Sequence, residues 1–254
     1  MSEQDLTIIK VGTGVLTREE DGRLDQASLV RLVTAVSEAV ASGHRCIMVS
    51  SGAVGAGISG LGLAAYPKDV ALRQACASVG QTRLMHNYQS LFQNFDLTAA
   101  QLLLTADDFN LENRSMRVTD TLEKLLAVPN IIPIINENDS VAVEEISVGD
   151  NDMLSARVAG LIGAKRLILL TSVDGLLPPE GGDIVSEVRN VADVLDYARD
   201  DSGKFSIGGM KSKLEAVQYA VERGTETIIA NGRNPKNILN LLAGEGIGTR
   251  FLTS

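Results

Sequence analysis

Short apolar runs that alternate with helical patterns are the feature that most constrains the fold of this chain. Runs that predict buried strands cover residues 6–11, 46–50, 97–104, 131–135, 166–171 and 227–230. Most are continuous in apolar residues, which is typical of parallel strands covered on both faces. Apolar residues at helical spacing predict helices at 28–41, 70–92, 118–127, 154–162, 211–222 and 235–242.

Strands that alternate with helices favour right-handed βαβ units. We therefore predict an α/β fold, a three-layer αβα sandwich with a mainly parallel central sheet. The length of 254 residues is near the upper limit for one hydrophobic core, and no Pro/Ser-rich linker or repeat divides it. We expect residues 1–254 to form a single domain, with residues 178–206 as a surface excursion.

Charge and hydropathy restrict the possible partners. The formal net charge of −9 argues against nucleic acid or an anionic membrane surface as the partner. No segment approaches the ~18 continuous apolar residues of a spanning helix, and the polar N-terminus has no signal-peptide pattern. We expect a soluble cytoplasmic protein in which Cys46 and Cys76 are inert core thiols.

A dense cluster of carboxylates and amides lies between residues 135 and 152. Its members are Asn136, Glu137, Asn138, Asp139, Glu144, Glu145, Asp150, Asn151 and Asp152. Like charges this close repel, so a fold keeps them together for a partner such as an ammonium group, a metal ion or backbone donors. The alternative is a solvated loop of turn-forming residues. The cluster follows a predicted strand, and ligands of open α/β sheets bind outside the carboxyl ends of strands.

Three glycine-rich junctions are candidate anion sites. Lys10 precedes Gly12-Thr13-Gly14, Ser51 precedes Gly52-Ala53-Val54-Gly55, and Gly208-Gly209 opens the helix that carries Lys211 and Lys213. Backbone N–H groups at such junctions can converge on an oxygen-rich ligand. Neither of the first two fits a Walker A or G-x-G-x-x-G pattern, and packing or turn geometry is the alternative explanation for these glycines.

Lysines at glycine-rich ends of an acidic protein suit a polyphosphate brought in with magnesium. Phosphoryl transfer needs charge neutralisation at the transferring oxygens and in-line positioning of the attacking group. Lys10 and Lys213 could hold the moving phosphoryl group from two sides, and Asp152 could hold both lysines in place. No residue is assigned as a metal ligand, because phosphate oxygens and water can coordinate Mg²⁺.

The motifs together resemble those of the glutamate 5-kinases, a family of the amino acid kinase superfamily. The resemblance covers essentially the whole chain. It is carried by Lys10-Val11-Gly12-Thr13, Ser51-Gly52-Ala53, Val79-Gly80-Gln81, Ile135-Asn136-Glu137-Asn138-Asp139, Val148-Gly149-Asp150-Asn151-Asp152 and Gly208-Gly209-Met210-Lys211-Ser212-Lys213. It implies ATP-dependent phosphorylation of the side-chain carboxylate of L-glutamate, giving L-glutamate 5-phosphate and ADP, the first step of proline biosynthesis.

The resemblance also implies a role for each matching residue. Lys10 and Lys213 would contact ATP phosphates, and Asp152 would orient them. The residues implied to hold glutamate are Ser51, Gly52, Asp139 and Asn151, and those implied to line the nucleotide are Thr171, Ser172, Ile207, Gly208, Gly209, Met210, Lys211, Ser212 and Lys213. The implied cofactor is Mg²⁺, and the implied assembly is a homo-oligomer, a dimer or tetramer.

The chain departs from the family pattern in four places. Ser172 stands where relatives often have Asp, residues 115–119 replace a Y-L-N-A-R pattern, and Ser147 stands where relatives often have Lys at a position linked to inhibition by proline. A PUA domain, which many relatives carry after the kinase core, is not expected here. Two other functions stay open: a superfamily kinase acting on an acylated amino acid or small phosphate acceptor, and a catalytically silent nucleotide-binding sensor.

Overall fold

The computed structural model describes residues 5–140, 151–198 and 209–253. Its centre is an eight-stranded sheet in the order β3-β4-β2-β1-β5-β7-β8-β6. The strands are β1 (Leu6–Val11), β2 (Arg45–Ser50), β3 (Thr98–Leu104), β4 (Ile131–Glu137), β5 (Arg166–Thr171), β6 (Glu187–Val188), β7 (Glu226–Asn231) and β8 (Thr249–Phe251). All neighbouring pairs are parallel except β7 and β8, which are antiparallel. The prediction of a mainly parallel sheet is confirmed.

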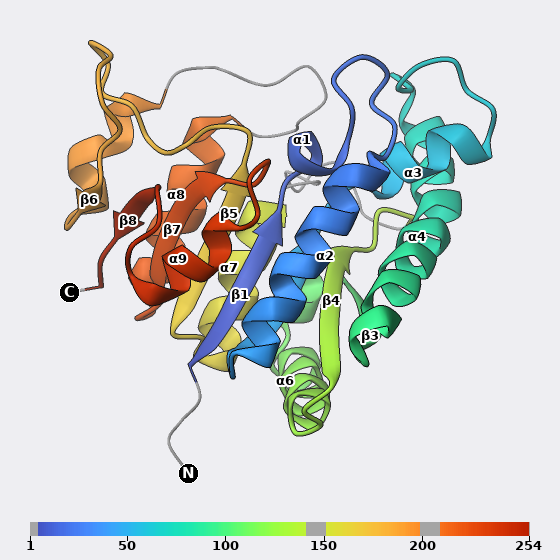
Figure 1. The fold of residues 1–254 in the computed structure, drawn as a ribbon, viewed down its shortest axis with the longest axis horizontal. Helices are drawn as coiled ribbons and strands as arrows, with labels where there is room; N and C mark the ends of the chain where they lie inside the picture. The colour runs from blue at the N-terminus through green and yellow to red at the C-terminus, as the bar shows by residue number, and fades with distance from the viewer. Residues whose placement is uncertain (1–4, 141–150, 199–208, 254) are drawn as a thin grey trace.

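Helices cover both faces of the sheet, as Figure 1 shows with α2 in front of the strands and α7 behind them. The helices are α1 (Thr13–Leu16), α2 (Gln26–Ala41), α3 (Ala53–Gly60), α4 (Val70–Phe92), α5 (Asp107–Asn110), α6 (Glu112–Leu126), α7 (Asn151–Ile162), α8 (Met210–Val221) and α9 (Asn237–Ala243). Two 3₁₀ segments cover Gln93–Phe95 and Val191–Tyr197. The predicted αβα sandwich is therefore also confirmed.

The strands form because their side chains are buried on both faces. Ile8 and Ile9 are adjacent in β1 and both fully buried, Ile9 in the cluster under α2, α4 and α9 and Ile8 in the cluster under α6, α7 and α8. Alternate residues of one strand therefore point to opposite helical layers. This sidedness decides where Lys10, two residues after Ile8, directs its side chain.

The segment 178–206 is not simply the surface excursion that we predicted. Its residues Glu187–Val188 form β6, which pairs with β8 at the edge of the sheet. Val188, Val191 and Val194 are buried in the core behind the sheet. These buried valines thus anchor the segment to the core despite its Pro- and Gly-rich start. Residues 199–206 lie outside the described part.

The second predicted glycine loop is a helix instead. Ala53–Gly60 forms α3 after a turn at Gly52, whose φ of 103° is in the left-handed region that favours glycine. A Cβ on Gly57 would lie 2.0 Å from the Cys76 carbonyl oxygen, and a Cβ on Gly80 would lie 1.7 Å from that of Ala53. These two glycines therefore serve close packing of α3 against α4.

Both cysteines lie in the core. Cys46 and Cys76 are buried, as predicted for core thiols, and burial raises the pKa of Cys46 to about 12. Within residues 5–140, 151–198 and 209–253, no helix has the length and apolar character needed to cross a membrane.

Candidate active site

Lys10, Asp152 and Lys213 come together at the carboxyl edge of the sheet. Lys10 is near the end of β1, Asp152 is in the first turn of α7, and Lys213 is in the first turn of α8. Lys10 Nζ lies 2.5 Å from Asp152 Oδ1, and Lys213 Nζ lies 3.1 Å from Asp152 Oδ2. One carboxylate thus holds two ammonium groups that are far apart in sequence, each on a separate oxygen.

The Asp152 carboxylate is buried but remains ionised. Burial alone would raise its pKa, whereas the Coulombic and hydrogen-bond interactions with Lys10 and Lys213 lower it, with a net value of about 2. Its position in the first turn of α7 adds the favourable field of a helix N-terminus. At neutral pH the cluster therefore carries two positive charges and one negative charge, a net attraction for an anion.

Gly12 allows the ends of β1 and β5 to approach each other closely beside Lys10. A Cβ on Gly12 would lie 3.2 Å from the Leu170 carbonyl oxygen and 3.6 Å from Lys10 Nζ. The Gly12 N–H also donates to that carbonyl oxygen, at 3.1 Å. The ends of β1 and β5 are thus joined directly next to the Lys10 ammonium.

The predicted nucleotide-binding residues lie on both sides of this junction. Thr171 ends β5, the exposed Ser172 follows it, and the Ser172 Cβ lies 3.9 Å from a Cβ built on Gly14. Gly209 caps the N-terminus of α8, whose first turn contains the remaining predicted residues Met210, Lys211, Ser212 and Lys213. Outside the described residues lie Glu144, Glu145, Ser147, Asp150, Ile207 and Gly208.

A pocket at the carboxyl ends of β2 and β4 brings together all four residues predicted to hold the amino acid substrate. We call it the acceptor pocket; its lining residues are Thr13, Ser51, Gly52, Ala53, Val54, Gly55, Tyr66, Asn136, Glu137, Asp139 and Asn151. Tyr66 was missed by sequence reasoning, because it lies in a loop outside any recognisable motif. Asn136 and Glu137 were noticed in the acidic cluster but received no role.

Asp139 is a pocket carboxylate whose titration is altered by its surroundings. Burial raises its pKa to about 6. Burial also raises the pKa of Tyr66, and the Asp139 carboxylate contributes to that rise, so these two side chains interact across the pocket. A desolvated carboxylate is a strong receptor for an ammonium group, since the ligand's charge would restore part of the lost solvation.

Asn151 connects the acceptor pocket to the lysine cluster. Its Nδ2 donates to Ser51 Oγ and to Asn136 Oδ1, both at 2.9 Å. The next residue, Asp152, holds the two lysines. Two consecutive residues at the start of α7 therefore face the pocket and the cluster respectively.

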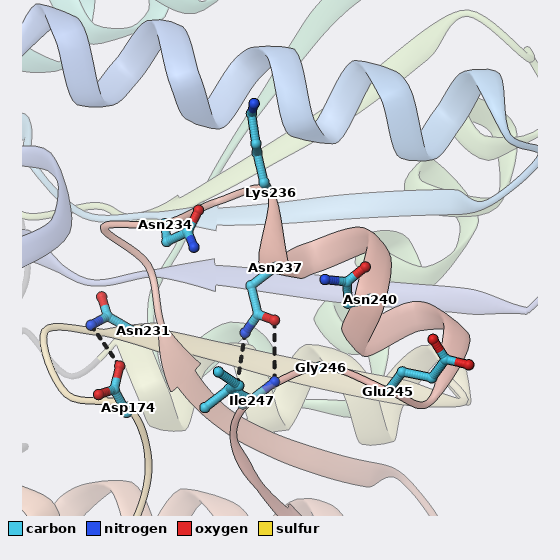
Figure 2. A pocket seen from close by; sticks show the side chains of 9 residues that line it. All are labelled: Asp174, Asn231, Asn234, Lys236, Asn237, Asn240, Glu245, Gly246 and Ile247. Carbon is cyan, nitrogen blue, oxygen red and sulfur yellow. Dashed lines mark hydrogen bonds between the residues drawn. The ribbon is translucent and has the colours of Figure 1, made fainter.

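A second polar pocket lies farther along the same edge, near the ends of β5 and β7 (Figure 2). It has a volume of about 220 Å³ and is lined by Asp174, Asn231, Asn234, Lys236, Asn237, Asn240, Glu245, Gly246 and Ile247. Asn231 Nδ2 donates to Asp174 Oδ1 at 2.9 Å, and Asn237 exchanges two hydrogen bonds with the backbone of Ile247. No motif in the sequence indicated this pocket.

Comparison with known proteins identifies the family. The model of the amino acid kinase family matches residues 5–231. The chain belongs to the amino acid kinase family. Its similarity to the glutamate 5-kinase of Nostoc sp. is 40% identity over 262 residues, covering 99% of this chain and 69% of that protein. The glutamate 5-kinase of Gloeobacter violaceus is 43% identical over 250 residues, covering 96% of this chain and 67% of that protein. The predicted resemblance is confirmed.

Solved structures support the amino acid kinase fold. Carbamate kinase from Giardia lamblia, bound to AMP-PNP, superposes with a TM-score of 0.68 at 14% identity and with 100% of both chains covered. Another structure of the Giardia enzyme gives a TM-score of 0.69 at 17% identity, again with 100% of both chains covered. At these identities the match concerns the fold alone.

Proposed function

We propose that this chain transfers the γ-phosphoryl group of ATP to the side-chain carboxylate of L-glutamate, giving L-glutamate 5-phosphate and ADP, the first step of proline biosynthesis. The observation that carries the proposal is the pair Asn151 and Asp152. The first lines a pocket suited to a small amino acid, and the second holds two lysines suited to a phosphoryl group. The identity to glutamate 5-kinases over nearly the whole chain supports the choice of glutamate.

The acceptor would bind in the pocket by its charges. The Asp139 carboxylate would receive the substrate ammonium, and the Ser51 hydroxyl with the backbone near Gly52 would donate to a substrate carboxylate. A free ammonium is then favoured over an acylated nitrogen, because an acylated substrate would leave Asp139 buried without a counter-charge.

The acceptor pocket lies at the ends of β2 and β4, on one side of β1 in the sheet. The nucleotide would therefore extend from the lysines to the other side of β1, toward the ends of β5 and β7. Thr171, Ser172 and the start of α8 are on that path. In the reaction, an oxygen of the glutamate side-chain carboxylate bonds to the γ-phosphorus of ATP. The bond from that phosphorus to the β,γ-bridging oxygen breaks, and ADP leaves.

Lys10 and Lys213 would neutralise the charge on the transferring oxygens, and Asp152 would keep both ammonium groups preorganised. When bound, Mg²⁺ supplies further charge neutralisation on the phosphates. Both Asp152 oxygens already contact lysines, and within the described ranges no three His, Cys, Asp or Glu side chains are grouped for a metal. Phosphate oxygens and water are therefore the expected ligands, with Asp152 as an outer neighbour.

A hydroxamate-trapping assay tests the proposal, because the acyl phosphate product reacts with hydroxylamine. Glutamate with ATP and Mg²⁺ should give hydroxamate and an equal amount of ADP, and aspartate or N-acetylglutamate should give much less. Faster turnover of N-acetylglutamate would support another kinase of the superfamily. Binding of ATP without glutamate-dependent ADP release would support a silent sensor.

One domain over residues 1–254, a cytoplasmic location and a homo-oligomeric assembly stay predictions.

A further inference from the structure

The Val79-Gly80-Gln81 motif has no role in the proposed reaction, yet the side chain of Gln81 is hydrogen-bonded to Asn136, a residue of the acceptor pocket. Gln81 is on α4, and its Oε1 accepts from Asn136 Nδ2 at 2.9 Å. Its Nε2 donates to Gln101 Oε1 on β3, also at 2.9 Å. The approach is possible because Gly80 brings the α4 backbone against Ala53 of α3.

The direction of these hydrogen bonds is fixed by a backbone group. The Glu137 N–H, which can donate but not accept, donates to Asn136 Oδ1 at 2.9 Å. The same Oδ1 accepts from Asn151 Nδ2, so Asn136 Nδ2 must point the other way, to Gln81. Gln81 thus has to present an oxygen, and Gln101 another oxygen behind it.

The consequence reaches Asn151, which lines the pocket. Both Nδ2 hydrogens of Asn151 are used, one toward Asn136 Oδ1 and one toward Ser51 Oγ. Its Oδ1 is buried and, among the residues that the structure describes, has no hydrogen-bond partner. Ser51 Oγ accepts from Asn151, so its own hydrogen is available to donate. Asn151 and Ser51, which both line the pocket, therefore keep one unused acceptor and one unused donor between them.

We infer that Gln81 is a positioning residue for the amino acid acceptor: together with the Glu137 N–H it holds the Asn136 amide in one orientation. That orientation maintains the polarity of Asn151 and Ser51, so that the former accepts from the substrate ammonium and the latter donates to a substrate carboxylate. This inference rests on the proposed function. It adds Gln81 of α4 as a specificity determinant, although the Gln81 side chain is not among the lining residues of the pocket.

The polarity explains why an oxygen is needed at position 81. A residue without an acceptor leaves Asn136 Nδ2 buried and unpaired, which favours rotation of the amide or of its neighbours. An inverted Asn136 would place its Nδ2 against the Glu137 N–H and Asn151 Nδ2. Asn151 could relieve its part of the clash by turning its Oδ1 toward Asn136, which takes that oxygen away from a ligand.

Substitutions at position 81 test the inference. Gln81→Glu keeps an oxygen toward Asn136, and Gln101 can turn its amide to donate to the second oxygen. Gln81→Met keeps the length and removes the acceptor. We expect the KM for glutamate to rise about tenfold in Gln81→Met and to stay within about twofold in Gln81→Glu, with the KM for ATP unchanged in both. If methionine prevents folding, Gln81→Ala carries the same test, because water that fills the gap can donate or accept and fixes no direction.

Gln89→Met is the matched control on the same helix. Gln89 also links α4 to β3, since its Oε1 accepts from the Ala99 N–H at 2.9 Å, but it has no part in the amide chain. We expect a lower Tm with an unchanged KM for glutamate. A folded Gln81→Met protein with a normal KM, a Gln81→Glu protein as impaired as Gln81→Met, or an equal effect of Gln89→Met would each overturn the inference. A parent protein without glutamate-dependent turnover would instead contradict the proposed function.

Discussion

Lys10 and Lys213 contact opposite oxygens of a single buried carboxylate, that of Asp152. The shared carboxylate fixes how far apart the two ammonium groups can lie. It also offsets an unfavourable interaction, because a lysine in the first turn of a helix is repelled by the helix dipole unless an anion is near. For Lys213 that anion is built into the protein.

Removing either lysine should impair turnover strongly without unfolding the protein, because Asp152 keeps the other lysine as a partner. We expect Lys10→Ala and Lys213→Ala each to lower kcat by about a hundredfold or more, since each removes a preorganised donor to the transferring oxygens. Lys165→Ala is the control, because Lys165 forms an exposed ion pair with Asp5. Steady-state ADP release and circular dichroism decide the matter; a folded Lys10→Ala protein with near-normal turnover would remove Lys10 from the reaction.

The carboxylate of Asp152 should matter for both stability and turnover. Asp152→Asn leaves two ammonium groups without their counter-charge, and breaking a buried ion pair costs about 3–5 kcal/mol. Urea unfolding at pH 7.5 would measure this loss. Adding Lys213→Met to the variant should recover part of the stability, because it removes one of the two ammonium groups that have lost the Asp152 carboxylate. An Asn variant as stable as the parent would show that the lysines do not depend on Asp152.

Glutamate affinity should depend on pH through Asp139. Its raised pKa of about 6 means that the carboxylate is charged above this pH and loses its charge below it. We therefore expect kcat/KM for glutamate to fall as the pH drops from 7 to 5, with much less change in the KM for ATP. In Asp139→Asn the value should be low throughout and the decline below pH 6 absent. An unchanged decline in that variant would assign it to another group.

The same shift predicts an opposite trend in stability. Because burial raises the Asp139 pKa from 3.8 to about 6, the folded protein retains a proton that the unfolded chain releases between these values. The free energy of unfolding should therefore fall as the pH rises through this window. The full destabilisation by the buried Asp139 charge is present above pH 6. Asp139→Asn does not titrate, so its Tm advantage over the parent should grow from pH 4 to pH 7. A constant Tm difference across that range would contradict the assignment.

The crossing of α3 and α4 should tolerate no side chain at its centre. Gly80→Ala would place a Cβ 1.7 Å from the Ala53 carbonyl oxygen, so the helices would have to separate. We expect a loss of several kcal/mol in stability, at the high end of single substitutions, and a raised KM for glutamate. Ser90→Ala introduces the same residue at an exposed position of α4 and should have little effect. Equal denaturant midpoints for the two variants would refute the packing argument.

Much of this architecture is predictable from local sequence. The predicted strands at 6–11 and 166–171 and the helix at 70–92 coincide with β1, β5 and α4, because long apolar runs and helical spacing are local signals. β6 and β8 were not predicted. With two and three residues they are too short to show a period, and pairing at the sheet edge specifies them.

The site was predictable in its members but not in its connections. Motifs indicated Lys10, Asp152 and Lys213, whereas the bond between Gln81 and Asn136 depends on how α4 crosses α3. The glycines of α3 were predicted either as a candidate anion site or as packing and turn residues, since a glycine after a strand can serve a turn, a ligand or close packing. Here Gly57 serves packing. Tyr66 carried no signal at all, because its position in the pocket results from the path of a loop.

The adjacency of Asn151 and Asp152 has a mechanical consequence. A single peptide bond joins the group that senses the acceptor to the group that spaces the phosphate-facing lysines. Any tilt of the first turn of α7 would therefore disturb both the binding of the acceptor and the transfer of the phosphoryl group. A molecule that fits the acceptor pocket poorly would therefore also misalign the lysines needed to phosphorylate it. Substrate specificity and catalytic rate are coupled in this way.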